Sequence, residues 1–211
     1  VMPKVEIRSI SEDKQRDLEK KIKSILVGSP AMNEVYNYSF VGVEQLKKLG
    51  VDSSAHLALK NPIANNQTLL RQSLSPNMLR NVVVNQARFE KLSFFEIGSI
   101  YLDLPGIMPK DDSTDEQLPY QEKHLSILAA GKNSLEVFSE IKGVVEHLFG
   151  GLRLKVDFLV SEMMPAYANK NIAAQISVAN KNIGSVFVLD KKTAKKAGVK
   201  KEVALVEISI N

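Results

Sequence analysis

Short strand-like runs that alternate with amphipathic helical patterns constrain the fold of this chain most. Two of these runs, 171–179 and 183–189, are joined through Lys181-Asn182. A connection this short links antiparallel strands, whereas parallel strands need a long crossover. Because hairpins are mixed with helices along the chain, the pattern predicts an α+β fold with a largely antiparallel sheet and flanking helices.

A first amphipathic helix is predicted near the N-terminus. Ser11 is suited to cap it, because its hydroxyl can accept a hydrogen bond from a free amide of the first turn. Gly28 and Pro30 are expected to end it. The apolar residues that recur at helical spacing in it are Leu18, Ile22, Ile25 and Leu26.

Later helices begin at residues that favour helix N-termini. Ser75-Pro76 combines a capping side chain with a proline whose missing amide costs nothing at the first helical position. We expect this helix to reach about Phe89, and a longer one to run from a cap at Ser134 to Gly150-Gly151. Short helices are expected over 45–49, before Gly50, and over 191–197, before Gly198.

Several strands are predicted from alternation and turn residues. Tyr36, Tyr38 and Phe40 alternate within 34–41, which would place the three rings on one strand face. Gly98 is expected to form a tight turn between strands over 92–98 and 99–104. Three prolines and an acidic run within 105–119 indicate a mobile hairpin loop or an insertion. Further strands are expected over 55–60, 124–130, 152–160 and 203–210.

Composition excludes several classes of site. The 211 residues include no cysteine, so disulfides, thiolate catalysis and cysteine metal sites are excluded, and a cytoplasmic location fits. No stretch approaches the ~18 apolar residues that span a bilayer, so we expect no membrane partner. The net charge of +4 is weak evidence for a polyanion partner. We expect one module over 1–211, and strand-like sequence at both ends suggests a fragment of a longer chain.

Motifs for chemistry are mostly missing, and we assign no catalytic, cofactor-binding or metal-binding residue. The glycines form neither a dinucleotide fingerprint nor a P-loop, and the Gly-rich, Arg-ended ATP motif of class II synthetases is missing. Arg71 is expected to anchor its loop through backbone carbonyls or a carboxylate, and Glu96 to form a structural ion pair. His124 and His147 are expected to be structural. The acidic residues of the 105–119 loop, which could bind Mg²⁺, are expected to be solvated: Asp111, Asp112, Asp115 and Glu116.

A lysine-rich helix is the strongest electrostatic candidate. Six lysines fall within residues 191–201, and they could neutralise the phosphates of a tRNA. The alternative is a solvated helix whose lysines lie near its C-terminal end, where positive charge is favourable. The candidate tRNA contacts are Lys191, Lys192, Lys195 and Lys196.

Three motifs resemble a known family. The runs are Leu69-Leu70-Arg71-Gln72-Ser73-Leu74-Ser75-Pro76, Phe95-Glu96-Ile97-Gly98 and Phe138-Ser139-Glu140-Ile141-Lys142-Gly143. They resemble the synthetase-like core of the phenylalanine–tRNA ligase β subunit, and Glu34 to Phe40 is similar to the first strand of that core. The chain departs from the family pattern at Met164-Pro165-Ala166-Tyr167 and at Val188 to Lys192, which puts any role of those loops in doubt.

The resemblance implies a class II aminoacyl-tRNA synthetase-like core that performs no chemistry itself. In such an (αβ)₂ ligase the α subunit holds the active site, which uses ATP and Mg²⁺ to join phenylalanine to its tRNA. The β module would pack against α. The interface candidates are Leu18, Ile22, Tyr36, Tyr38 and Phe40.

Three hypotheses therefore remain open. The chain is a non-catalytic scaffold for the α subunit, or a divergent ligase domain active by itself, or an autonomous RNA-binding module that uses the run from Lys191 to Lys201. The second requires a phosphate-holding arginine and a carboxylate-bound Mg²⁺ in one cleft, and the sequence offers no such pair.

Overall fold

The protein is built around one large antiparallel sheet with helices on both faces. The computed structural model describes residues 13–28, 30, 32–106 and 118–210. The helices are α1 (Lys14–Gly28), α2 (Val43–Lys48), α3 (Ser75–Asn85), α4 (Ser134–Gly151) and α5 (Lys191–Ala197). The strands are β1 (Asn33–Glu34), β2 (Phe40–Val41), β3 (Leu69–Leu70), β4 (Leu92–Pro105), β5 (Pro119–Gly131), β6 (Val156–Leu159), β7 (Ala168–Val178), β8 (Lys181–Leu189) and β9 (Glu202–Ser209).

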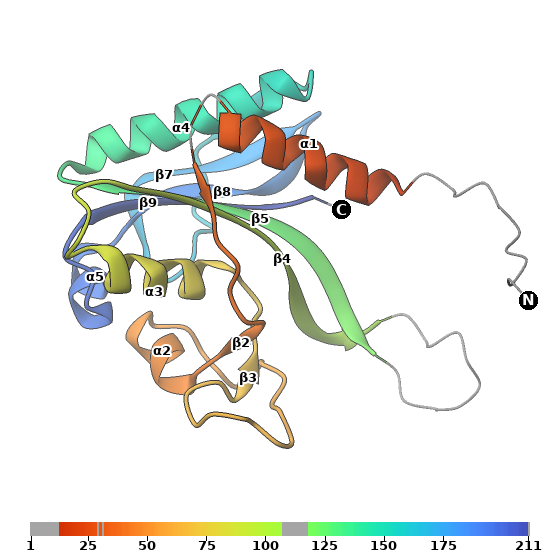
Figure 1. Ribbon diagram of the computed structural model, residues 1–211, viewed down its shortest axis with the longest axis vertical. Helices are drawn as coiled ribbons and strands as arrows, with labels where there is room; N and C mark the ends of the chain where they lie inside the picture. Colours follow the sequence, from red (N-terminus) through yellow and green to blue (C-terminus); the bar gives the residue numbers. More distant parts are fainter. Residues whose placement is uncertain (1–12, 29, 31, 107–117, 211) are drawn as a thin grey trace, which may run out of the picture.

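The large sheet has seven strands in the order β1-β4-β5-β9-β8-β7-β6. Every neighbouring pair is antiparallel except β1 and β4, which are parallel at one edge. A small sheet of β2 and β3 lies below it with α2 (Figure 1). The prediction of an α+β fold with a largely antiparallel sheet is therefore confirmed.

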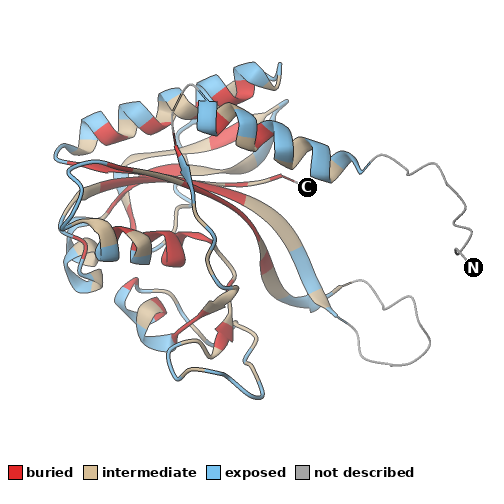
Figure 2. Cartoon of the chain, in the orientation of Figure 1, coloured by how far each residue is buried: buried red, intermediate tan, exposed pale blue. Residues whose placement is uncertain are grey.

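The sheet separates two apolar cores, because successive strand residues point to opposite faces. Ile127 on β5 and Val206 on β9 pack with α1 and α4 on the upper face in Figure 1. Their neighbours Leu128 and Leu205 pack with α3 on the lower face. Figure 2 shows buried residues along the central strands and exposed residues on the outer sides of the helices.

The tight turn predicted at Gly98 is wrong, because Gly98 lies in the middle of one continuous strand, β4. Residues 92–105 pair with β5 without interruption from Leu92 to Leu102. A Cβ at position 98 would overlap the Nη2 atom of Arg71 and would lie 3.2 Å from its Cζ atom. The glycine is therefore required by the close approach of a side chain, not by a turn.

The two serine caps are also corrected. The α4 cap is Asn133, whose side chain accepts from the backbone amides of Leu135 and Glu136. At α3 the cap position is Leu74, whose own side chain makes no capping hydrogen bond. The Ser75 hydroxyl instead donates to Glu207 at 2.6 Å. Ser11 lies outside the described residues.

Some boundaries differ from the predicted ones. Between β1 and β2 the predicted 34–41 strand is broken, and residues 55–60 make only one isolated bridge, Ala58 to Leu69. Helix α3 ends at Asn85 rather than Phe89. The β7–β8 turn is at Ala179 and Asn180, which both have positive φ as a two-residue hairpin turn requires.

The hairpin predicted around 105–119 is confirmed at its base. Pro105 of β4 pairs with Pro119 of β5, so the two strands enter and leave this segment side by side. Residues 107–117, which include the acidic run, lie outside the described residues. No helix in the part of the chain that the structure describes is long and apolar enough to cross a membrane.

Candidate functional site

A buried ion pair fixes the segment after β1 against the large sheet. Arg71 and Glu96 have side chains only 3% and 1% exposed, and their Nη1 and Oε1 atoms are 2.7 Å apart. Arg71 also donates from Nε to the carbonyl of Ser99 at 2.9 Å. The second carboxylate oxygen of Glu96 accepts from the side-chain amide of Asn37 at 2.7 Å. The additional hydrogen bonds are what a buried pair needs to offset its desolvation.

Both expectations for this pair are confirmed: Arg71 anchors a loop through a carboxylate and backbone carbonyls, and Glu96 forms a structural ion pair. The Arg71 backbone also joins neighbouring segments, since its amide donates to the Ser39 carbonyl and its carbonyl accepts from Tyr101. Gly98 leaves the space that the guanidinium occupies. The loop before α3 is thereby held on the lower face of the sheet.

A second buried carboxylate, Glu207 on β9, binds the start of α3. It accepts from the hydroxyls of Ser73 and Ser75, both at 2.6 Å, and from the Leu74 amide at 3.0 Å. Burial alone would raise the pKa of Glu207, but the bond from His124 and the serine donors together hold it below its ordinary value. An ionised Glu207 thus replaces a capping side chain at this helix N-terminus, where negative charge is favourable.

His124 lies between two carboxylates. Its Nδ1 is 3.1 Å from Glu207 and its Nε2 is 3.1 Å from Glu122. Burial lowers the pKa of His124, but the two carboxylates outweigh burial and raise it above its ordinary value. Both ring nitrogens of His124 therefore have partners within the chain, as expected for a structural histidine. Tyr167, whose pKa burial raises to about 12, lies with its hydroxyl 3.4 Å from the Ser73 hydroxyl.

The same network presents aromatic side chains outward. Tyr36 and Tyr38 are 90% and 72% exposed, although the backbone of their segment is hydrogen-bonded to the large sheet. The Val35 amide donates to the Phe95 carbonyl, and the Tyr38 carbonyl accepts from Asn77 at 2.9 Å. Val84 on α3 adds a third large side chain, 67% exposed. A hollow of about 320 Å³ lies between the 36–40 segment and α3.

Two of the predicted interface residues lie elsewhere. Ile22 is 1% exposed in the upper core, and Leu18 packs against that core, so Ile22 offers no surface to a partner. Phe40 is half-buried beside the hollow. Tyr36 and Tyr38 do not share a regular strand, but both are exposed at the same hollow.

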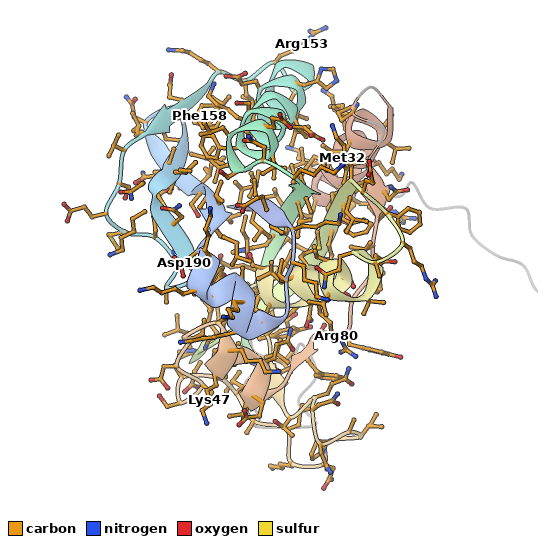
Figure 3. All side chains as sticks on the ribbon, turned by 90° about the vertical axis from the view of Figure 1, so that its left-hand side faces the viewer. Met32, Lys47, Arg80, Arg153, Phe158 and Asp190 are labelled. Carbon is orange, nitrogen blue, oxygen red and sulfur yellow. The ribbon has the colours of Figure 1, made fainter. Side chains whose placement is uncertain are left out.

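The predicted lysine contacts lie together on α5. Asp190 caps this helix by accepting from the Thr193 amide at 2.9 Å, and Gly198 ends it in the left-handed conformation. Lys191 and Lys195 line a hollow of about 360 Å³ with two further lysines, Lys200 and Lys201, and with Glu202. Figure 3 views the molecule from the side of α5. In this view Asp190 lies above the level of Arg80, and Lys47 lies below the level of both. In the described part of the chain, no three His, Asp or Glu side chains are grouped so as to hold a metal ion.

A family model described as "Phenylalanyl tRNA synthetase beta chain CLM domain" matches residues 1–210. The chain belongs to this family. The phenylalanine–tRNA ligase β subunit of Leptospira biflexa is 31% identical over 146 residues, which cover 66% of this chain and 17% of that protein. The β subunit of Dehalococcoides mccartyi strain CBDB1 is 27% identical over 201 residues, or 90% of this chain and 23% of that protein. The chain therefore spans about a fifth of the curated relatives' length.

The fold of this β-subunit module is also that of class II synthetases. A pyrrolysyl-tRNA synthetase from Desulfitobacterium hafniense superposes with a TM-score of 0.70 at 14% identity, covering 93% of this chain and 66% of that one. The predicted class II synthetase-like core is confirmed by this similarity. Sequence reasoning missed Glu207 in the module. Its one signal was a single carboxylate within an otherwise apolar strand, Val203 to Ile208.

Proposed function

We propose that this module is a non-catalytic scaffold within the β subunit of phenylalanine–tRNA ligase, and that it holds the catalytic α subunit. The observation that carries the proposal is the exposed pair Tyr36 and Tyr38 on a backbone fixed from behind by Arg71 and Glu96. Tyrosine is enriched in binding hot spots. A segment that is already ordered loses little conformational entropy when it binds, so this surface is preorganised for a partner.

A scaffold role agrees with the buried, paired state of Arg71. Arg71 is buried and already bound to Glu96, so it is not free to hold the phosphates of ATP. In the proposed assembly ATP and Mg²⁺ act at the α subunit, and this module binds neither. The assembly is an (αβ)₂ heterotetramer in the cytoplasm that attaches phenylalanine to its tRNA.

The test is to mix the chain with the α subunit and measure the molar mass of the product by light scattering. A defined complex is the expected result. A clean monomer of the chain beside free α, at concentrations of about 10 µM where a standard-sized interface binds, would contradict the scaffold role. Phenylalanine-dependent exchange of pyrophosphate into ATP by the chain alone would contradict the non-catalytic role.

A second candidate function rests on the lysine-lined hollow at α5. Lys191, Lys195, Lys200 and Lys201 line it, and Glu202, whose carboxylate is 3.9 Å from Lys191, is the one acidic residue among the described lining residues. We propose that an RNA backbone binds at this face. The test replaces Lys191, Lys192, Lys195 and Lys196 with glutamine. Binding of tRNA should weaken, and the salt dependence of binding should become shallower by about one unit for each phosphate that the variant no longer neutralises. Equal tRNA affinity of the variant would contradict this function.

A further inference from the structure

The hollow beneath Tyr36 and Tyr38 has a chemical character of its own. Arg80 and Asn81 of α3 line it, together with other amide side chains and with no carboxylate among the described residues. Its walls therefore supply hydrogen-bond donors and one positive charge. The two exposed tyrosines form part of its rim.

Two of the lining residues carry a group that lacks a partner among the described residues. The Nδ2 atom of Asn81 is buried and makes no hydrogen bond. A buried donor without an acceptor is costly, so native structures rarely leave one. Arg80 is exposed and forms no ion pair with any described side chain. The other amides are used within the chain, as Asn77 donates to the Tyr38 carbonyl and Asn85 to the Asn81 carbonyl.

From these features we infer that the hollow receives an aspartate or glutamate side chain of the α subunit, bound by Arg80 and Asn81. The inference rests on the proposed scaffold function and names the anchor of its interface. A guanidinium binds a carboxylate with charge-assisted hydrogen bonds, and the inference requires the buried Asn81 amide to turn so that its Nδ2 atom reaches an acceptor in the hollow. Tyr36 and Tyr38 exclude water around the pair, which strengthens it.

The arrangement matches that of energetic centres in known protein interfaces. Arginine and tyrosine are, with tryptophan, the residues enriched in such centres, and these centres lie in pockets surrounded by contacts that exclude water. Here one arginine without a described ion-pair partner and two exposed tyrosines surround one hollow. An apolar partner side chain would leave Asn81 unsatisfied, and a basic one would meet Arg80. A neutral acceptor would satisfy Asn81 but leave the Arg80 charge unpaired, whereas an acidic side chain satisfies both.

The test measures the dissociation constant between the α subunit and the β chain that carries each of three substitutions. Arg80→Glu and Asn81→Asp place a carboxylate in the hollow. The matched control is Arg88→Glu, an exposed arginine just beyond α3 that does not line the hollow. Arg80→Glu and Asn81→Asp should weaken α binding by about 30-fold or more, because each opposes a buried charge. Arg88→Glu should change it by about two-fold at most.

Charge exchange then identifies the partner residue. Each surface aspartate and glutamate of α is changed in turn to arginine and mixed with Arg80→Glu. One exchange should restore binding by about 10-fold or more, since the pair is direct. If no exchange restores α binding, the inference is wrong. It is also wrong if neutralising the chain's own acidic run, residues 111–116, abolishes the loss of α binding that Arg80→Glu causes. The thermal midpoint of each variant shows whether it still folds.

The outcomes separate the inference from the function on which it rests. Absence of an α complex with the unchanged β chain contradicts the scaffold function itself. Loss of binding on Tyr36→Ala/Tyr38→Ala, with full binding by Arg80→Glu and Asn81→Asp, leaves the scaffold function standing and overturns the carboxylate anchor.

Discussion

The guanidinium of Arg71 occupies the space that any side chain at residue 98 would need, since a Cβ on Gly98 would overlap its Nη2 atom. This contact couples the loop before α3 to the middle of β4. Behind it, Glu96 holds the same guanidinium at 2.7 Å. The position of Tyr36 and Tyr38 therefore depends on a glycine that is distant from them in sequence.

Gly98→Ala should destabilise the fold by about 3 kcal/mol or more, because the new methyl group displaces one partner of a buried ion pair. Chemical denaturation monitored by circular dichroism measures the change. Gly143→Ala is the matched control, since a Cβ there meets nothing within 4 Å on α4. The control should raise stability by about 0.5–1 kcal/mol, the helix preference for alanine over glycine. Equal effects of the two substitutions would show that Arg71 does not occupy this space.

Glu96→Gln should cost about 3–5 kcal/mol of stability, because it leaves the Arg71 charge buried and uncompensated. Replacing both partners by methionine should cost less than Glu96→Gln alone, and urea midpoints of the two variants compare them directly. Breaking the exposed pair of Lys132 and Glu90 through Glu90→Gln should leave the midpoint unchanged. A Glu96→Gln midpoint equal to that of the unaltered chain would contradict the structural role of the pair.

The stability contributed by His124 and Glu207 should be greatest between about pH 4.5 and pH 6.5. The pKa of His124 is raised from 6.5, so its contribution is complete below pH 6.5 and is lost as pH rises through the folded-state value. The pKa of Glu207 is lowered from 4.5, so its contribution is complete above pH 4.5 and is lost as pH falls through the folded-state value.

The measurement is the difference in unfolding free energy between the unaltered chain and His124→Gln across pH 4 to 9. This difference should shrink as pH rises above 6.5. Burial lowers the pKa of His56, so the contribution of His56 to stability increases as pH rises. Taking the difference between the two chains removes that contribution. A difference that stays constant with pH would contradict the proposed protonation of His124 between Glu122 and Glu207.

The sequence was sufficient for the elements whose signals are local. Helix α5 begins and ends where Lys191 and Gly198 predicted, and the apolar runs of β5 and β9 fall where expected. The roles of Arg71 and Glu96 followed from the rule that buried charges are paired. Local signals misled where a distant residue decides the conformation. Gly98 suggests a turn unless it is known that the Arg71 guanidinium packs against it. Ser75 suggests a helix cap unless it is known that its hydroxyl donates to Glu207.

The candidate interface was predictable only in part for the same reason. Alternation placed Tyr36, Tyr38 and Phe40 on one face, but it could not say that α3 completes the surface with Arg80 and Asn81. Helical spacing marked Ile22 as apolar without distinguishing a core residue from an interface residue. Only the packing of α1 on the sheet makes that distinction.

The most direct test of the scaffold function is the α-binding affinity of the double variant Tyr36→Ala/Tyr38→Ala, measured beside its thermal midpoint. Both side chains are largely exposed, so the midpoint should move by no more than about 2 °C. The account predicts that this variant folds normally and that its affinity for the α subunit falls at least about 100-fold, as expected when two interface centres are removed. A folded variant that binds α as tightly as the unaltered chain would contradict it.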